Sequence, residues 1–128
     1  MHRVVIAGVA SAMLLALLPA ASAEARSVYF RAKPSGITCG ALRIERRSAT
    51  LRCDLPFAGR RAGFLHTQGK GEIKRVSSFM HPRKRAVLRR GSTRSFGPFS
   101  CVSLRAAVSC RVAGGHGFTL GRSFQLVF

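Results

Sequence analysis

The sequence predicts a small all-β domain, a sandwich or a barrel, that is held together by two disulfides within hairpins. Short segments of alternating apolar and polar residues recur along the chain, and glycine or proline separates most of them. The four cysteines form an even set in a chain of 128 residues. No stretch of ten residues after the first 23 keeps the apolar period of an α-helix.

The expected strands are short and regularly spaced. They cover residues 28–31, 37–44, 50–55, 86–90, 99–104, 107–112, 117–120 and 123–128. Turn residues lie between them at Pro34-Ser35-Gly36, Gly97-Pro98 and Gly114-Gly115. The closing segment 124–128 is the most strand-like, so we expect a buried Phe128 and a carboxyl terminus paired into a sheet. Residues 56–85 are rich in glycine and arginine and predict a loop, with one strand near 71–76.

The cysteine positions favour one disulfide pairing among three. Cys53 and Cys110 each lie between apolar residues in a strand pattern, in Leu51-Arg52-Cys53-Asp54-Leu55 and in Val108-Ser109-Cys110-Arg111-Val112. A turn near 46–49 would bring Cys39 to Cys53, and a turn at 104–107 would bring Cys101 to Cys110. Neither pair has the tight spacing of a zinc knuckle. We therefore predict disulfides Cys39–Cys53 and Cys101–Cys110, with no metal and no cofactor.

Residues 1–23 have the pattern of a cleavable signal peptide. Arg3 is followed by an apolar segment from Val4 to Leu18, and Ala21-Ser22-Ala23 fits a cleavage site. The apolar segment is short for a permanent membrane anchor. A buried core helix is the alternative, but the segment has no polar face. We expect cleavage after Ala23 and a secreted domain over 24–128, either extracellular or associated with the envelope.

The chain is strongly basic, with 22 Lys and Arg residues against four Asp and Glu. No acidic residue follows Glu72. A basic run is the candidate anion-binding surface, and it consists of Lys74, Arg75, Arg83, Lys84, Arg85, Arg89, Arg90 and Arg94. Outside a cell, such cations could bind an anionic envelope polymer or an anionic membrane surface. The alternative is a solvated basic face. With few aromatic residues and no tryptophan, sequence-specific recognition of nucleic acid is not expected.

An enzymatic role would centre on His116, which lies among glycines. A histidine acting as a general acid or base needs a partner, which could be Asp54, Glu45 or a second histidine, His66 or His81. The simpler interpretation is a turn residue, and Ser35 is interpreted in the same way. We therefore predict a non-enzymatic protein, with a small secreted hydrolase or nuclease using His116 as one alternative. A protein-binding or inhibitor domain using the loops around 91–98 is another.

Several motifs in order along the chain resemble a known family. They are Phe30 to Cys39 with its Pro34-Ser35-Gly36 turn, Arg52-Cys53-Asp54, Val87 to Gly91, Phe99 to Ser103, Val108-Ser109-Cys110 and the closing Gly115-His116-Gly117-Phe118-Thr119-Leu120-Gly121-Arg122. This order resembles a family of small exported actinobacterial proteins classed as a domain of unknown function. Many of its members carry a tryptophan and additional cysteines where residues 57–85 here have none. The resemblance implies export and a disulfide-bonded β fold, and it implies no catalytic residue.

Overall fold

A computed structural model describes residue 8 and residues 26–44 and 48–128. The predicted signal peptide and the tip of the predicted turn near 46–49 therefore lie mainly outside the described residues. Within the described part of the chain, no helix has the length and hydropathy needed to cross a membrane.

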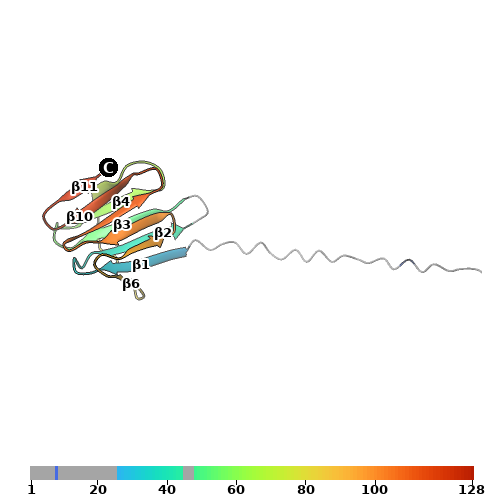
Figure 1. Ribbon diagram of the computed structural model, residues 1–128, viewed down its shortest axis with the longest axis horizontal. Coiled ribbons are helices and arrows are strands. Elements are labelled where there is room, and N and C mark those ends of the chain that lie inside the picture. Colours follow the sequence, from blue (N-terminus) through green and yellow to red (C-terminus); the bar gives the residue numbers. More distant parts are fainter. Residues whose placement is uncertain (1–7, 9–25, 45–47) are drawn as a thin grey trace, which may run out of the picture.

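The described residues form two β-sheets that pack face to face as a sandwich (Figure 1). The six-stranded sheet has the order β5 (Glu72–Arg75), β4 (Arg61–His66), β3 (Thr50–Leu55), β2 (Thr38–Ile44), β1 (Arg26–Ala32) and β6 (Ala86–Leu88). The five-stranded sheet has the order β11 (Gln125–Val127), β10 (Gly117–Gly121), β9 (Ala107–Val112), β8 (Phe99–Ser103) and β7 (Thr93–Phe96). Neighbouring strands are antiparallel except β1 and β6, which are parallel. The predicted all-β sandwich is confirmed.

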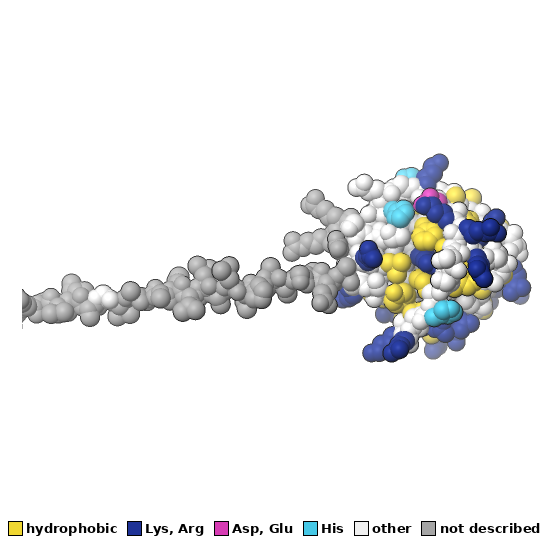
Figure 2. All heavy atoms as spheres, turned by 180° about the vertical axis from the view of Figure 1, so that it is seen from behind, with side chains coloured by type: hydrophobic (Ala, Val, Ile, Leu, Met, Phe, Trp, Pro, Cys, Tyr) yellow, Lys and Arg dark blue, Asp and Glu magenta, His cyan; other side chains and the backbone are white. Residues whose placement is uncertain are grey.

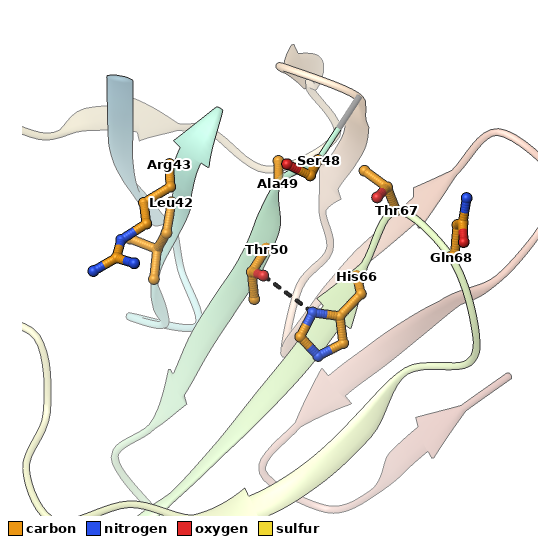
Figure 3. Close-up of a pocket in the computed structure, with 8 residues that line it drawn as sticks. All are labelled: Leu42, Arg43, Ser48, Ala49, Thr50, His66, Thr67 and Gln68. Atoms are coloured by element: carbon orange, nitrogen blue, oxygen red, sulfur yellow. Dashed lines mark hydrogen bonds between the residues drawn. The ribbon is translucent and has the colours of Figure 1, made fainter. Parts of the chain in front are cut away.

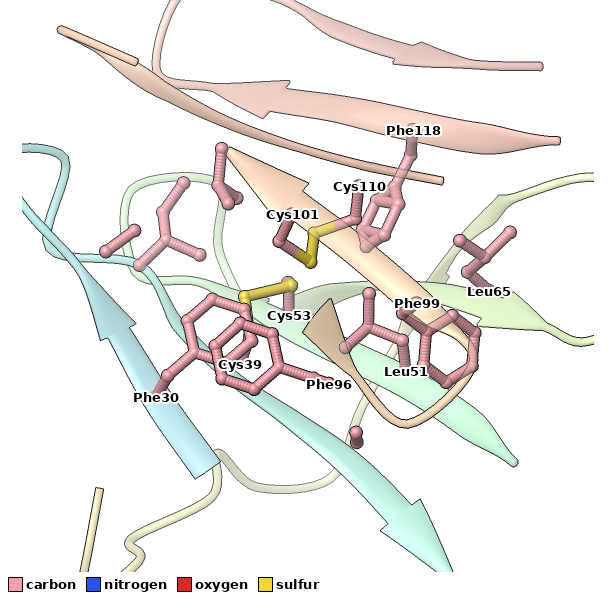
Figure 4. Packing of buried hydrophobic residues seen from close by; sticks show 14 of the residues in the cluster. Phe30, Cys39, Leu51, Cys53, Leu65, Phe96, Phe99, Cys101, Cys110 and Phe118 are labelled. Atoms are coloured by element: carbon pink, nitrogen blue, oxygen red, sulfur yellow. A yellow bond between two sulfur atoms is a disulfide. The ribbon is translucent and has the colours of Figure 1, made fainter. Parts of the chain in front are cut away.

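Both predicted disulfides are confirmed, and each joins two residues that face each other on neighbouring strands. Cys39 on β2 pairs with Cys53 on β3, and Cys101 on β8 pairs with Cys110 on β9. All four residues are buried. Figure 4 shows the two sulfur bridges close together between the sheets, so one disulfide belongs to each sheet and both belong to one core.

The core follows from the alternation in the sequence. Leu51, Cys53 and Leu55 point inward from β3, as their spacing predicts, because successive side chains of a strand point to opposite faces. The rings of Phe30 on β1 and Phe96 on β7 are stacked with centroids 4.0 Å apart, which joins the two sheets (Figure 4).

Two strands were not predicted. Residues 56–85 contain β4 as well as β5, so the prediction of one strand near 71–76 is only partly right. Position 63 on β4 requires glycine because the opposite sheet packs closely against it. A Cβ atom would lie 2.5 Å from the Leu120 side chain. This glycine marks close packing of two sheets and not a turn. The other missed strand is β7, a mostly polar edge strand in which only Phe96 is buried.

The carboxyl terminus is paired into a sheet, as predicted. Phe128 N donates to Gly117 O at 3.0 Å, and Gly117 N donates to Phe128 O at 2.9 Å. The expected burial is wrong, however, because Phe128 is only partly buried and the β11 side chains are exposed. An edge strand has a neighbour on one side only.

Residues 76–85 form a strap across the outer face of the six-stranded sheet and return the chain from β5 to β6. Asp54, 4% exposed, holds the strap: Met80 N donates to Asp54 Oδ2 at 2.7 Å. Arg52 Nε donates to Asp54 Oδ1 at 2.8 Å, and Arg52 Nη2 donates to Ser78 O at 2.5 Å. The strap lets β6 run parallel to β1, because a parallel neighbour needs a crossover connection.

Candidate functional site

The structure divides the basic run that the sequence singled out. Lys74 and Arg75 lie on β5, at one edge of the six-stranded sheet. Residues 83–85 precede β6 at the opposite edge, five strand spacings or about 24 Å away. Arg89 and Arg90 follow β6, and Arg94 lies on β7 with its guanidinium 5.6 Å from the Phe96 ring. Figure 2 shows basic side chains scattered over one face of the molecule. The eight cations do not share one surface.

The strand directions bring a different set of residues together. In the six-stranded sheet, β1, β3, β5 and β6 finish at the same end at which β2 and β4 begin. In the five-stranded sheet, β8 and β10 finish where β7, β9 and β11 begin. The connections at this pair of strand ends are residues 33–37, 56–60, 89–92, 104–106 and 122–124.

Hydrogen bonds show that the connections from the two sheets meet at the same end of the sandwich. Lys33 N donates to Leu88 O at 2.9 Å, and Ser103 Oγ donates to Lys33 O at 2.7 Å. Gly91 N also donates to Ser103 O at 2.7 Å. These contacts place the β1–β2, β6–β7 and β8–β9 connections side by side.

The remaining connections complete the end. A Cβ atom on Gly121, at the end of β10, would lie 2.8 Å from Ala106 O, so the β10–β11 and β8–β9 turns are adjacent. The Arg122 guanidinium lies 5.6 Å from the ring of Phe57 in the β3–β4 turn. Val76 N, just after β5, donates to Arg60 O at 2.7 Å. A series of contacts therefore links all five connections and the end of β5.

This end carries exposed cations in every connection. We call it the basic end, and its cationic residues are Lys33, Arg60, Arg61, Arg75, Arg89, Arg90, Arg105 and Arg122. All of them are exposed. Three belong to the predicted basic run, whereas Lys33, Arg60, Arg61, Arg105 and Arg122 were not predicted as site residues.

The described carboxylates do not neutralise the basic end. Asp54 is buried under the strap and is paired with Arg52. Glu72 lies at the opposite end of β5, where Lys74 Nζ is 2.9 Å from its Oε1. The hydrogen bond from Lys74 holds the pKa of Glu72 below its usual value, and His66, 3.5 Å away, acts in the same direction. Both described acids are thus engaged elsewhere.

Two of the cations face each other directly. Arg61 on β4 and Arg75 on β5 are partners in the strand register. Like charges at directly opposed positions destabilise a sheet, typically by a few tenths of a kcal/mol. A bound anion would relieve this repulsion, and a carboxylate at either position would relieve it permanently.

The opposite end of the sandwich has a hollow of about 820 Å³ between β2, β3 and β4 (Figure 3). Thr50 Oγ1 is 3.0 Å from His66 Nδ1 within it. The hydroxyl of Thr50, the imidazole of His66 and the carboxylate of Glu72 follow one another in the order found in a catalytic triad. However, the 3.5 Å between His66 Nε2 and Glu72 is long for a hydrogen bond, and the same carboxylate oxygen is closer to Lys74. The side chains of His66 and Glu72 are 47% and 41% exposed.

His116 lies in the turn between β9 and β10, as its glycine neighbours predict. Gly114 and Gly115 have φ values of 100° and 94°, a region that favours glycine. His116 contributes its carbonyl oxygen, which accepts from Val112 N at 2.9 Å. Asp54 is on the outer face of the other sheet and is committed to Arg52 and Met80. Among the described residues, no group of histidine, cysteine and acidic side chains could hold a metal ion.

Residues 83–85 line a second hollow of about 620 Å³ with Ser27, Val28 and Tyr29 near the start of β1. Tyr29 lies over β2 at Gly40, where a Cβ atom would be 2.7 Å from the tyrosine ring. This hollow is remote from the basic end along the sheet, so its three cations form a separate group.

Comparison with protein-family models finds no matching family, and comparisons with curated proteins and with solved structures also find no match. The resemblance noted from the motifs therefore stays a prediction.

Proposed function

We propose that the protein is a secreted, non-enzymatic protein that binds an anionic component of the cell envelope through its basic end. The observation that carries this proposal is the convergence of five cation-bearing connections at one end of the sandwich, with the two described carboxylates engaged elsewhere. Signal-peptide cleavage after Ala23 is part of the proposal, and the two disulfides are compatible with an extracellular protein.

Arginine suits this role better than lysine. Its planar guanidinium can donate two parallel hydrogen bonds to a phosphate or carboxylate. Apart from Lys33, the cations of the basic end are arginines. The field of several uncompensated charges would also attract a polyanion from a distance and make binding sensitive to salt.

The test compares two variants that remove the same charge from different places. Replacing Arg89, Arg90 and Arg105 with Gln should weaken binding to a soluble polyanion such as polyphosphate. It should also reduce the slope of log affinity against log salt by about one for each lost contact. The matched control replaces Arg83, Lys84 and Arg85, which are also exposed, with Gln. Equal losses in both variants, or binding that ignores salt, would contradict the proposal.

One alternative has an observation in its favour. β7 is the edge strand of the five-stranded sheet, and Thr93, Arg94 and Ser95 are exposed. A partner protein could add a strand there, which is how the loops around 91–98 would serve a protein-binding or inhibitor domain. A protein ligand whose affinity is unchanged by the Arg89, Arg90 and Arg105 substitutions would favour this alternative. A hydrolase or nuclease using His116 gains no catalytic partner from the described contacts.

A further inference from the structure

The basic end also presents large apolar side chains to solvent. Leu104, in the β8–β9 turn, is 39% exposed, and Phe124, in the β10–β11 turn, is 52% exposed. The two turns are adjacent, because a Cβ atom on Gly121 would lie 2.8 Å from Ala106 O and 3.6 Å from the Phe124 ring. Leu104 and Phe124 therefore belong to neighbouring loops of one surface.

Cations flank both apolar residues. Arg105 follows Leu104 in its turn, and Arg122 precedes Phe124 by two residues. The guanidinium of Arg122 also lies 5.6 Å from Phe57, which brings a third turn to the same place. Apolar and basic side chains are thus interleaved at the tips of connections from both sheets.

Two of the exposed apolar residues, Leu104 and Phe124, lie in connections of the basic end. Among the described residues, the large exposed hydrophobics are Val87, Leu104, Phe124, Leu126 and Val127. Leu126 and Val127 lie farther along β11, which runs from the Phe124 turn toward the opposite end, and Val87 lies on the edge strand β6. A single exposed apolar residue needs no explanation, but a pair on adjacent turns beside uncompensated cations does.

We infer that the anionic partner of the basic end is a lipid bilayer surface, into which Leu104 and Phe124 insert while the surrounding arginines contact the headgroups. This inference rests on the proposed function of the basic end as an anion-binding surface. A soluble polyanion would use the cations alone. A bilayer interface uses both kinds of side chain, because apolar burial and attraction to anionic lipid act together in peripheral binding.

The absence of tryptophan from the sequence makes a direct test possible. Phe124→Trp and Leu104→Trp each place a single fluorophore at a loop tip of the mature, oxidised protein. Vesicles containing phosphatidylglycerol should shift the emission of both variants to the blue, and vesicles of phosphatidylcholine alone should not. Val127→Trp is the matched control, since Val127 is 39% exposed, like Leu104, but lies toward the opposite end of the sandwich, paired with Phe118. Its emission should not change.

Serine variants measure how much the insertion contributes. Leu104→Ser and Phe124→Ser should each weaken partition into the anionic vesicles by about tenfold. Binding to polyphosphate and the melting temperature should stay the same, and Val127→Ser should partition like the unmodified protein.

The outcomes separate this inference from the proposed function. Salt-dependent binding of polyphosphate without binding to anionic vesicles would overturn the inference and leave the proposed function standing. Failure to bind either ligand would overturn both. Vesicle binding with no blue shift and no effect of the serine substitutions would show a purely electrostatic contact and would also overturn the inference.

Discussion

The two ends of the sandwich share the same strands and the same core, yet their described connections differ in charge, although exposed Arg26, Arg43 and Arg111 lie at strand ends of the opposite end. The basic end has a cation in each of its five connections. At the opposite end, the described connections 67–71, 97–98 and 113–116 contain only one Lys or Arg, Lys70. That end also has the Glu72 carboxylate with two cationic or potentially cationic neighbours, Lys74 and His66. The connections of an antiparallel sandwich can therefore specialise at one end while the scaffold stays common to both.

Removing a disulfide should have the largest effect and should act on both ends. Replacing Cys101 and Cys110 with Ala releases a covalent loop with a sequence separation of 9. We expect a loss of up to about 3 kcal/mol in the free energy of unfolding, from greater freedom of the unfolded chain. Urea unfolding of the oxidised protein and the variant would measure it. If the variant lost hydrogen-exchange protection at one end only, with no global loss of stability, that result would contradict a core shared by both ends.

Asp54 should matter next, because the strap that it holds connects the basic end to the opposite edge. Asp54→Asn removes the charge that binds Arg52 and one acceptor of the network around Met80. We expect a loss of about 2 kcal/mol in unfolding free energy and faster hydrogen exchange at the Met80 amide. Ser78→Ala is the control, since Ser78 contributes its backbone oxygen. An equal loss in both variants would show that the strap is held by other contacts.

A smaller effect of opposite sign is expected at the basic end itself. Arg75→Gln removes the like-charge pair with Arg61, so the unfolding free energy should rise by about 0.5 kcal/mol. Polyanion affinity should fall in the same variant. Arg83→Gln, which removes an exposed arginine outside the strands, should leave stability unchanged. If Arg75→Gln is destabilising, the charge repulsion inferred at this end is wrong.

The smallest effect concerns the opposite end and depends on pH. Lys74→Met should raise the pKa of Glu72 toward its ordinary value of 4.5, because the Lys74 hydrogen bond is the main cause of its lowering. A carboxylate with a lowered pKa adds stability above its unfolded-state pKa, and this is lost as the pH falls through the folded-state value. The stability difference from the unmodified protein should therefore be slight at neutral pH and vanish in acid. Carboxyl NMR titration would measure the pKa, and Lys70→Met should leave it unchanged.

The fold class and the disulfides could be predicted because local alternation determines them. Leu51, Cys53 and Leu55 point inward together, so the pattern places the cysteine in the core before any partner is known. Gly63 could not be interpreted in this way. A side chain at this position would clash with Leu120 and Phe118 on the other sheet, and no local pattern reveals that contact.

The basic end could not be predicted because its residues come together only through topology. Lys33 and Arg122 are distant in sequence, whereas the predicted basic run includes a strap that places its members at opposite edges of the six-stranded sheet. Strand number has a further effect. Each hairpin reverses the chain direction. If β4 is left out, every later turn is therefore placed at the wrong end of the sandwich. The basic end could be found from the sequence by counting the cations in each turn, but only if all the strands were predicted correctly.

The register of the first and last paired residues has a practical consequence for tethering. Arg26, at the start of β1, pairs with Ile44, and Phe128 pairs with Gly117; both pairs lie at the end opposite the basic end. A fusion partner, a tag or a surface linkage at either place would leave Lys33, Arg105 and Phe124 directed away from the attachment point. The domain is therefore suited to oriented immobilisation, with its five connections presented to whatever ligand is passed over the surface.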